Sequence, residues 1–372
     1  MHARFARCLG SAVAGIALVS LGLGGAANAA DASPQEVTTG ATAGPVTAYV
    51  ANLGSRTVIP IRGATAGTPI FTGHVANAIA ITPNGGTVYV VDRYTGTVTP
   101  ISTATNTAGR PITTGYGPNT IAITPSGKTA YVPNLTSGTV TPINTATNTA
   151  GRPIATGYGP YAIAITPNGE TAYVANSGAD TVIPIHTATN TAGPAIATGS
   201  DPFAIAITPD GKTAYVANYD SGTVTPIHTA TNTAGRPIPT GPGSIAIAIT
   251  PDGKTAYVAN DESATVTPIS TATDTASPPI KTGPRPHAIA ITPDGKTAYV
   301  ANYDSATVTP IHTATNTAGP LIISWRNPIA IAITPHPCST GDAPAVLTGA
   351  AASDALVPSP GGLRQYPARR VS

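Results

Sequence analysis

Short apolar runs alternate with polar turns along most of the chain, and they recur with a fixed period. The run Ala-Ile-Ala-Ile-Thr-Pro, or a close variant, ends at prolines that stand 42 residues apart: Pro83, Pro125, Pro167, Pro209, Pro251, Pro293 and Pro335. A second run begins with Tyr-Val at Tyr49, Tyr89, Tyr131, Tyr173, Tyr215, Tyr257 and Tyr299. A period of this length, built from short runs without helical spacing, predicts an array of β units such as a propeller.

One unit, residues 204–245, shows where the strands are expected. Residues 204–208 form an apolar run, and the Pro-Asp-Gly-Lys sequence that follows supplies the residues a tight reversal needs. Three further runs lie at 213–217, 223–227 and 237–240. Four strands without a helix are the content of one propeller blade. Because Ala alternates with Ile in the first strand, we expect each blade to offer small side chains to the large ones of its neighbour.

The two ends of the array complement each other. Six complete units begin near Ala78, Thr120, Ala162, Ala204, Ala246 and Ala288. Residues 330–334 add one more first strand, whereas residues 45–77 hold a second, third and fourth strand with no first strand before them. The sequence therefore predicts an all-β fold, a seven-bladed β-propeller of four-stranded blades over residues 45–335. Its seventh blade would combine the C-terminal strand with three N-terminal strands, which closes the ring and removes its open edge.

Every expected third strand contains a proline: Pro60, Pro100, Pro142, Pro184, Pro226, Pro268 and Pro310. Proline has no N–H to give to a neighbouring strand and is usual at edges and bulges. We therefore expect the outer two strands of each blade to pair only partly.

The repeated phrase Ala-Ile-Ala-Ile-Thr-Pro-Asp-Gly-Lys-Thr-Ala-Tyr-Val-Ala-Asn resembles the YVTN-type β-propeller repeat of secreted and surface-layer-like proteins, over residues 45–335. The last letter of the family motif is kept as Asn in six units, at Asn52, Asn134, Asn176, Asn218, Asn260 and Asn302, and is replaced once, by Asp92. The third letter is mostly Ala rather than Thr. The resemblance implies a propeller in a secreted or surface protein and no particular activity.

The N-terminus has the features of a secretory signal peptide over residues 1–30. Arg4 and Arg7 precede an apolar run, and the small residues 26–30 offer an Ala-x-Ala cleavage site. We therefore expect a secreted protein, extracellular or at the cell surface. We expect residues 31–44 to form an N-terminal segment. We expect residues 336–372, which are rich in Ala, Pro, Gly and Ser, to form a disordered tail. Cys338 would be the only cysteine left after cleavage, which excludes an intramolecular disulfide.

Charge excludes two classes of partner. The signal peptide holds two of the 18 Lys and Arg residues and none of the 16 Asp and Glu residues, so the mature chain has 16 of each. Without a basic excess we expect no nucleic-acid binding and no affinity for acidic lipids. No stretch beyond the signal peptide approaches the roughly 20 apolar residues of a membrane-spanning helix.

Sequence variation between units gathers in the loops before the first strands and between the second and third strands. Alternating strand directions place both kinds of loop on one face. Immediately before the first strands the units have Asn77, Asn119, Tyr161, Phe203, Ile245, His287 and Ile329, and close by are Tyr116, Tyr158, Asp201, Arg285, Trp325 and Arg326. The second kind of loop holds Arg93, Tyr94, Tyr219, Asp261, Glu262, Tyr303 and Asp304. Exposed aromatic residues are typical of binding surfaces, so we expect the ligand here.

Three functions fit this pattern. The variable aromatic face favours a non-catalytic scaffold that binds a cell-envelope polysaccharide or a surface protein. The alternative is a lactonase-like hydrolase or lyase at the channel mouth, with His287 as acid or base and Arg285, Asp201 and Glu262 beside it. A structural surface-layer component is the third. No cofactor motif occurs, and His186, His228 and His312 fall on separate units, so no metal site is expected.

Overall fold

The computed structural model describes residues 48–52, 56–62, 65–73, 76–324 and 328. Within these residues the regular structure consists of β-strands, and none of them forms a helix that could cross a membrane. The signal peptide, the segment 31–44, Trp325, Arg326, the expected strand at 330–334 and the C-terminal tail all lie outside the described residues.

The strands form seven antiparallel sheets. The first has four strands, β1 (Ala48–Asn52), β2 (Thr57–Arg62), β3 (Thr65–Ala66) and β4 (Ile70–Phe71). The next three are β5 (Ala76–Ile81), β6 (Thr87–Asp92), β7 (Thr97–Ser102), β8 (Thr107–Ala108), β9 (Ile112–Thr113); β10 (Ala122–Ile123), β11 (Thr129–Asn134), β12 (Thr139–Asn144), β13 (Thr149–Ala150), β14 (Ile154–Ala155); and β15 (Pro160–Ile165), β16 (Thr171–Asn176), β17 (Thr181–His186), β18 (Thr191–Ala192), β19 (Ile196–Ala197). The last three are β20 (Pro202–Ile207), β21 (Thr213–Asn218), β22 (Thr223–His228), β23 (Thr233–Ala234), β24 (Ile238–Pro239); β25 (Ser244–Ile249), β26 (Thr255–Asn260), β27 (Thr265–Ser270), β28 (Thr275–Ala276), β29 (Ile280–Lys281); and β30 (Pro286–Ile291), β31 (Thr297–Asn302), β32 (Thr307–His312), β33 (Thr317–Ala318), β34 (Ile322–Ile323).

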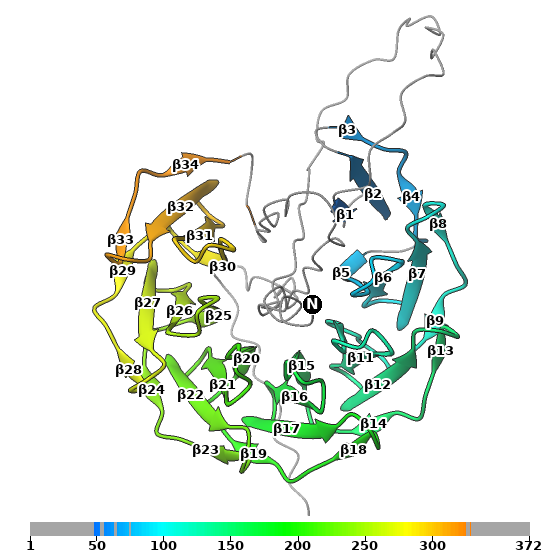
Figure 1. The fold of residues 1–372 in the computed structure, drawn as a ribbon, viewed down its shortest axis with the longest axis horizontal. Coiled ribbons are helices and arrows are strands. Elements are labelled where there is room, and N and C mark those ends of the chain that lie inside the picture. Colours follow the sequence, from blue (N-terminus) through cyan, green and yellow to red (C-terminus); the bar gives the residue numbers. More distant parts are fainter. Residues whose placement is uncertain (1–47, 53–55, 63–64, 74–75, 325–327, 329–372) are drawn as a thin grey trace, which may run out of the picture.

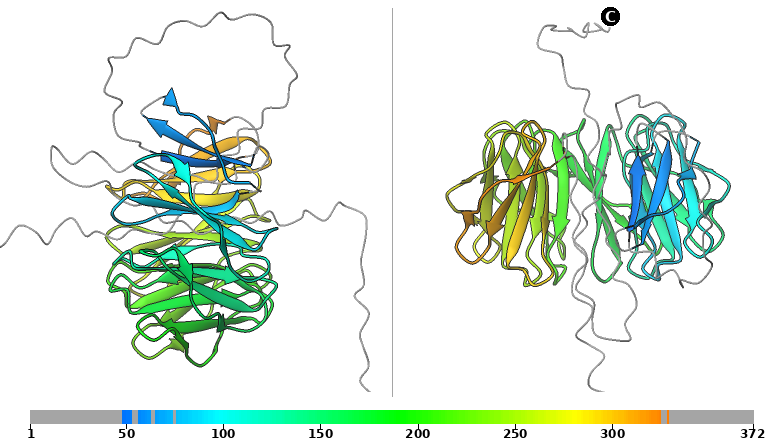
Figure 2. Two further views of the ribbon diagram at one scale, coloured as in Figure 1. Left: turned by 90° about the vertical axis from the view of Figure 1, so that its right-hand side faces the viewer. Right: turned by 90° about the horizontal axis from the view of Figure 1, so that it is seen from above.

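The sheets stand around a central axis, as Figure 1 shows, with strands of the β5 and β15 type nearest the axis and the short strands at the outer rim. In the side views of Figure 2 the strands run roughly along that axis. This arrangement is a β-propeller fold, and it confirms the predicted fold class at the level of an all-β propeller with seven sheets.

The expected fourth strand at 237–240 corresponds to β24, but each sheet also has a further short strand before it, such as β23, which was not expected. Proline explains why the two short strands are separate. In the sheet β15–β19, Pro184 lies between the residues of β17 that pair with β18 and those that pair with β19. Pro184 has no N–H to donate, but its carbonyl accepts a 2.8 Å hydrogen bond from Gly193. The equivalent bond recurs in all seven sheets at 2.7 to 2.8 Å. The prediction that the outer strands pair only partly is confirmed.

The hydrophobic core consists of layers between neighbouring sheets. In β15, Ile163 packs against residues of the preceding sheet, such as Ala122 and Val140. Ala162 and Ala164, on the opposite side of the strand, pack against the large Ile205 of the next sheet. The expected alternation of small and large faces is confirmed, and it lets sheets that are covered on both sides pack closely.

A tyrosine from each second strand reaches across to the next sheet. Six tyrosines donate a hydrogen bond of 2.5 to 2.6 Å to an Asn or Asp in the hairpin loop of the following sheet: Tyr49 to Asn106, Tyr89 to Asn148, Tyr131 to Asn190, Tyr173 to Asn232, Tyr215 to Asp274 and Tyr257 to Asn316. The acceptors have φ of 52° to 55°, a left-handed backbone that Asn and Asp tolerate better than most residues. Burial raises the pKa of Tyr131 to about 12, so its hydroxyl stays a donor at neutral pH.

Among the described residues, the two end sheets show no such hydrogen bond to each other. The segment between β2 and β3 is two residues long, whereas the corresponding segment of the other sheets has four. Tyr299 is half-buried, whereas the five tyrosines from Tyr89 to Tyr257 are fully buried. Ile322 is 49% exposed, while its six equivalents are 4 to 7% exposed. Among the described residues, these two side chains of the last sheet are therefore less covered than their equivalents in the other sheets.

Replacing Tyr131 by Phe should lower the free energy of unfolding by about 1 to 2 kcal/mol, because it removes the hydrogen bonds to Asn190 and to the carbonyl of Thr187. Chemical denaturation measures this loss. Tyr299→Phe is the matched control and should have little effect. An equal loss in both variants would contradict the stabilising role given to the contact between sheets.

Candidate functional site

Two kinds of loop interlock on one face of the molecule, as the alternating strand directions predict. This loop face comprises residues 93–96, 115–117, 135–138, 157–159, 177–180, 199–201, 219–222, 241–243, 261–264, 283–285 and 303–306. In every sheet a Thr or Ser near the first kind of loop donates its N–H to a carbonyl of the second kind, as Thr114 does to Gly96 at 2.8 Å. The accepting residue has a positive φ in all seven cases. The loops are thus held by backbone bonds that leave their side chains free to vary.

The predicted ring of residues before the first strands coincides with a β-bulge. In β15 the register shifts between Pro160 and Ala162, so Tyr161 is the extra residue. The same shift occurs at Asn77, Phe203, Ile245 and His287. A bulge re-aims the side chain of its extra residue. Asn77 and Tyr161 reach from their own sheet to the next one in this way.

The polar members of this ring are buried and bonded to each other. Asn77 Nδ2 donates a 2.6 Å hydrogen bond to the carbonyl of Asn119, and Asn119 Nδ2 donates a 2.9 Å bond to the carbonyl of Tyr161. Asn77, Asn119 and Tyr161 are 5%, 0% and 6% exposed. The Tyr161 ring stacks on half-buried Phe203 with 4.2 Å between centroids, and Phe203 contacts Tyr219 at 5.8 Å. These groups join neighbouring sheets and offer little surface to a ligand.

Three tyrosines of the loop face are exposed instead. Tyr94, Tyr116 and Tyr158 are 80%, 79% and 74% exposed, on loops of the three sheets from β5 to β19. The backbone of Tyr116 is fixed, because its N–H donates to Ser137 Oγ at 2.7 Å and its carbonyl accepts from Thr136. Rigid, exposed tyrosines form contacts at a low cost in conformational entropy.

The opposite side of the loop face holds a group of paired charges. Asp261, 3% exposed, accepts two hydrogen bonds from the Arg285 guanidinium, at 3.1 and 3.2 Å. Arg285 also lies 5.5 Å from the Tyr303 ring centroid and 4.0 Å from Asp304. The hydrogen bonds that Arg285 donates to Asp261 raise the pKa of Arg285 above its ordinary value. Arg285 is thus a structural cation that ties three loops together.

His287 and Glu262 lie in the same region. The His287 ring is 5.9 Å from the Tyr303 ring, between centroids, and half-buried. Glu262 accepts a 3.3 Å hydrogen bond from the Tyr219 hydroxyl, and burial together with Asp261 and Glu262 raises the pKa of Tyr219 to about 12. An imidazole is the side chain that most often serves as acid or base in enzymes. Asp261, the buried carboxylate of this region, is already bound to Arg285.

Asp201 lies among like charges. Its backbone has a φ of 54°, where equivalent loops have Gly117, Gly159 and Gly243, and its N–H donates a 2.9 Å bond to Asp180. Burial, and then the charges of Asp220 and Asp180, raise the pKa of Asp201 to about 6. No group of three or more His, Cys, Asp or Glu residues in the described part of the chain is arranged to hold a metal ion.

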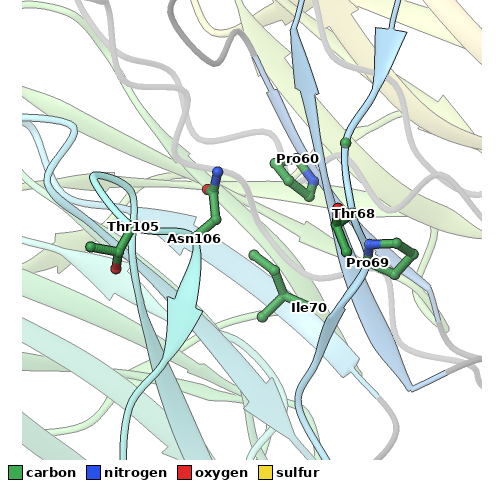
Figure 3. Close-up of a pocket in the computed structure, with 7 residues that line it drawn as sticks. Pro60, Thr68, Pro69, Ile70, Thr105 and Asn106 are labelled. Atoms are coloured by element: carbon green, nitrogen blue, oxygen red, sulfur yellow. The ribbon is translucent and has the colours of Figure 1, made fainter. Parts of the chain in front are cut away.

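A hollow of about 410 Å³ lies away from the loop face, at the rim between the first two sheets (Figure 3). Its lining consists of Pro60, Gly67, Thr68, Pro69, Ile70, Thr105 and Asn106. None of these side chains is an acid, a base or a charged group, so the hollow offers no catalytic chemistry.

The sequence candidates thus separate into three groups. Tyr116 and Tyr158 are exposed, Asp201, Phe203, Arg285 and His287 are half-buried, and Asn77, Asn119 and Tyr161 are buried. Trp325 and Arg326 lie outside the described residues. Tyr94 was named only as a loop residue, although its exposure matches that of Tyr116. Asp180 was not among the sequence candidates. It lies two residues after Gly178, the glycine against which the Tyr158 ring lies.

Solved structures with this fold include proteins of different chemistry. No family model matches the sequence, and no curated protein is significantly similar to it. A hydrazine synthase chain from Kuenenia stuttgartiensis is similar at 22% identity and a TM-score of 0.60, covering 76% of this chain and 99% of that one. A protein of unknown function from Desulfotomaculum acetoxidans is similar at 21% identity and a TM-score of 0.63, covering 78% of this chain and 98% of that one. A "putative 6-phosphogluconolactonase" from Bacteroides uniformis is similar at 19% identity and a TM-score of 0.60, covering 74% of this chain and 95% of that one. At these identities the likeness shows the fold alone.

Asp201→Asn should raise thermal stability more at pH 8 than at pH 4. The folded-state pKa of about 6 lies above the ordinary 3.8, so the stability this group contributes is full below about pH 4 and is lost as pH rises through 6. Asn cannot ionise and tolerates the positive φ. Melting temperatures measured from pH 4 to 8 test this. Asp220→Asn removes one of the two neighbouring carboxylate charges, so it should shift the loss of stability to lower pH. A constant difference between wild type and Asp201→Asn would contradict the shift.

Proposed function

We propose that this protein is a secreted, non-catalytic β-propeller that binds an extracellular ligand, a cell-envelope polysaccharide or a surface protein, through its loop face. The observation that carries the proposal is the set of exposed tyrosines at 94, 116 and 158. Large exposed aromatic side chains on rigid loops are the typical anchors of binding sites. The loops of the other face repeat Thr-Ala-Thr-Asn-Thr and similar sequences almost unchanged, so they present little specific surface.

Secretion is supported by the N-terminal sequence, with Arg4 and Arg7 before an apolar run and small residues at 26–30. The resemblance to YVTN-type repeats, which occur in secreted and surface-layer-like proteins, agrees with that location. A cell-envelope ligand is the partner class that both features favour.

The proposed ring closes through residues 330–334, which repeat the first-strand sequence. The six other sheets each have such a strand on the inner edge of the second strand, whereas β1 has no strand partner there among the described residues. Tyr303 of the last sheet packs against the core cluster that includes Ala51 and Ala78. This contact supports closure of the ring on the side of the loop face.

An enzyme is the alternative, and one group of residues favours it. His287 and Arg285 both contact the Tyr303 ring, Arg285 is bound to Asp261, and the Bacteroides neighbour carries a lactonase name. A hydrolase of this kind would use His287 as its acid or base. The binding function is better supported, because the only cation of this group is already held by Asp261 and Asp304.

Combined Tyr94→Ala, Tyr116→Ala and Tyr158→Ala substitutions should abolish retention of the protein by isolated cell-envelope material in a pull-down. The fold should be unaffected, since all three side chains are exposed. Tyr161→Ala is no substitute, because that ring is buried between sheets. Equal retention of wild type and triple variant would refute the site. Turnover of a lactone that His287→Ala abolishes would favour the enzyme instead.

Removing residues 330–372 should lower the melting temperature and broaden the transition, because the first sheet would lose its inner strand. Removing only residues 336–372 is the matched control and should leave the transition unchanged. Calorimetry of the two truncated proteins measures the difference. Identical transitions would argue against closure by this strand.

A further inference from the structure

We propose that Tyr94, Tyr116 and Tyr158 form a row of subsites for an uncharged, linear glycan. This inference rests on the proposed function and narrows its ligand from two classes to one. Each pyranose ring has an apolar face of C–H groups that stacks on an aromatic ring, while its hydroxyls bond to polar groups at the side. Amphipathic tyrosines on loops of Ser, Thr and Gly offer both kinds of contact.

The three tyrosines lie along one continuous belt of backbone contacts. The loop of Tyr94 accepts a 2.8 Å bond at Gly96 from Thr114, at the start of the loop of Tyr116. Tyr116 in turn bonds to Ser137, and the neighbouring Gly138 accepts a 3.1 Å bond from Thr156, just before the loop of Tyr158. The rings are therefore presented in a fixed order, from the sheet β5–β9 to the sheet β15–β19.

Tyr158 shows that the loops are shaped to hold a ring in place. Its ring lies against the backbone of Gly178 so closely that a Cβ at that position would collide with it. The ring nevertheless remains 74% exposed. A ring supported on backbone from below and open to solvent is a stacking platform that loses little freedom on binding.

Two of the three tyrosines repeat from one sheet to the next. Tyr116 and Tyr158 stand 42 residues apart, at equivalent positions of successive sheets, so they present the same surface twice in related orientations. A linear glycan offers the same sugar again at a regular spacing. Several weak contacts to one chain then add through effective concentration. Most folded proteins lack such a repeat on their surfaces, so a glycan fits this row better.

The charges around the row select an uncharged chain. In the loops 93–96, 115–117, 135–138 and 157–159, Arg93 is the one charged residue. Beyond Tyr158 the loops become acidic, with Asp180, Asp201 and Asp220. A polyanionic chain that ran past Tyr158 would approach these carboxylates and be repelled.

Calorimetric titration of the full mature chain with oligosaccharides of glucose, mannose and N-acetylglucosamine, two to eight units long, tests the proposal. We expect affinity for at least one series to rise with chain length until the chain spans the row. Each single Tyr→Ala change should lower the affinity for the longest oligosaccharide by about threefold to tenfold. Gly178→Ala should act like Tyr158→Ala, since it displaces the ring without removing it. Phe71→Ala is the control, because it removes an aromatic ring, 64% exposed, outside the row.

The outcomes separate this inference from the proposed function. If no series binds at millimolar concentration while envelope proteins still retain the wild type and not the triple variant, the glycan is refuted and the binding function stands. If neither is retained, both fail. Tighter binding of polygalacturonate than of neutral chains would overturn the uncharged ligand, and affinity independent of length would overturn the row of subsites.

Discussion

The hydrogen bond from a tyrosine hydroxyl to the hairpin Asn of the next sheet is the contact on which the arrangement of sheets depends. A propeller sheet touches only its neighbours, so each interface must be stable and must also fix the relative orientation of two sheets. Apolar packing of Ile against Ala makes the interface stable, but it is not directional. The buried tyrosine fixes the orientation, because its hydroxyl must find an acceptor or leave a buried donor unpaired. Asp274 replaces Asn once and accepts from Tyr215 as a charged group, which is one cause of the raised pKa of Tyr215.

The proline of each third strand solves a different problem, the exposed outer edge. A continuous fourth strand would present a row of unpaired N–H and C=O groups to other molecules. Proline removes one N–H toward that strand, and the chain responds with two pieces of two residues separated by three. A broken rim is a poor template for another strand. This protection is useful in a chain with few charged residues, where repulsion between molecules is weak.

Much of the fold could be predicted from the sequence, because the information is local and repeated. The Ile and Ala alternation, the Pro-Asp-Gly turns and the third-strand prolines each report on structure within a few residues, and the structure agrees with all three. Less of the candidate site could be predicted. Sequence position placed Asn77 and Asn119 beside a channel mouth, but both side chains donate hydrogen bonds to backbone carbonyls of the neighbouring sheet, and at Asn77 a β-bulge accompanies this. The carboxylates around Asp201 come from loops 19 to 21 residues apart, and their mutual repulsion depends on tertiary contacts.

The scaffold separates what must stay constant from what can change. The tyrosine hydroxyls bond at the hairpins between third and fourth strands, on the face opposite the variable loops. On the loop face the recurrent bonds run from a backbone N–H to a backbone carbonyl, so Tyr116, Ser200 and Pro242 can occupy equivalent positions without changing them. Side chains there can therefore respond to a ligand while the sheets stay in place. The uneven result, with tyrosines over three sheets and carboxylates over the next ones, shows that the side chains of this face vary from sheet to sheet while the scaffold stays the same.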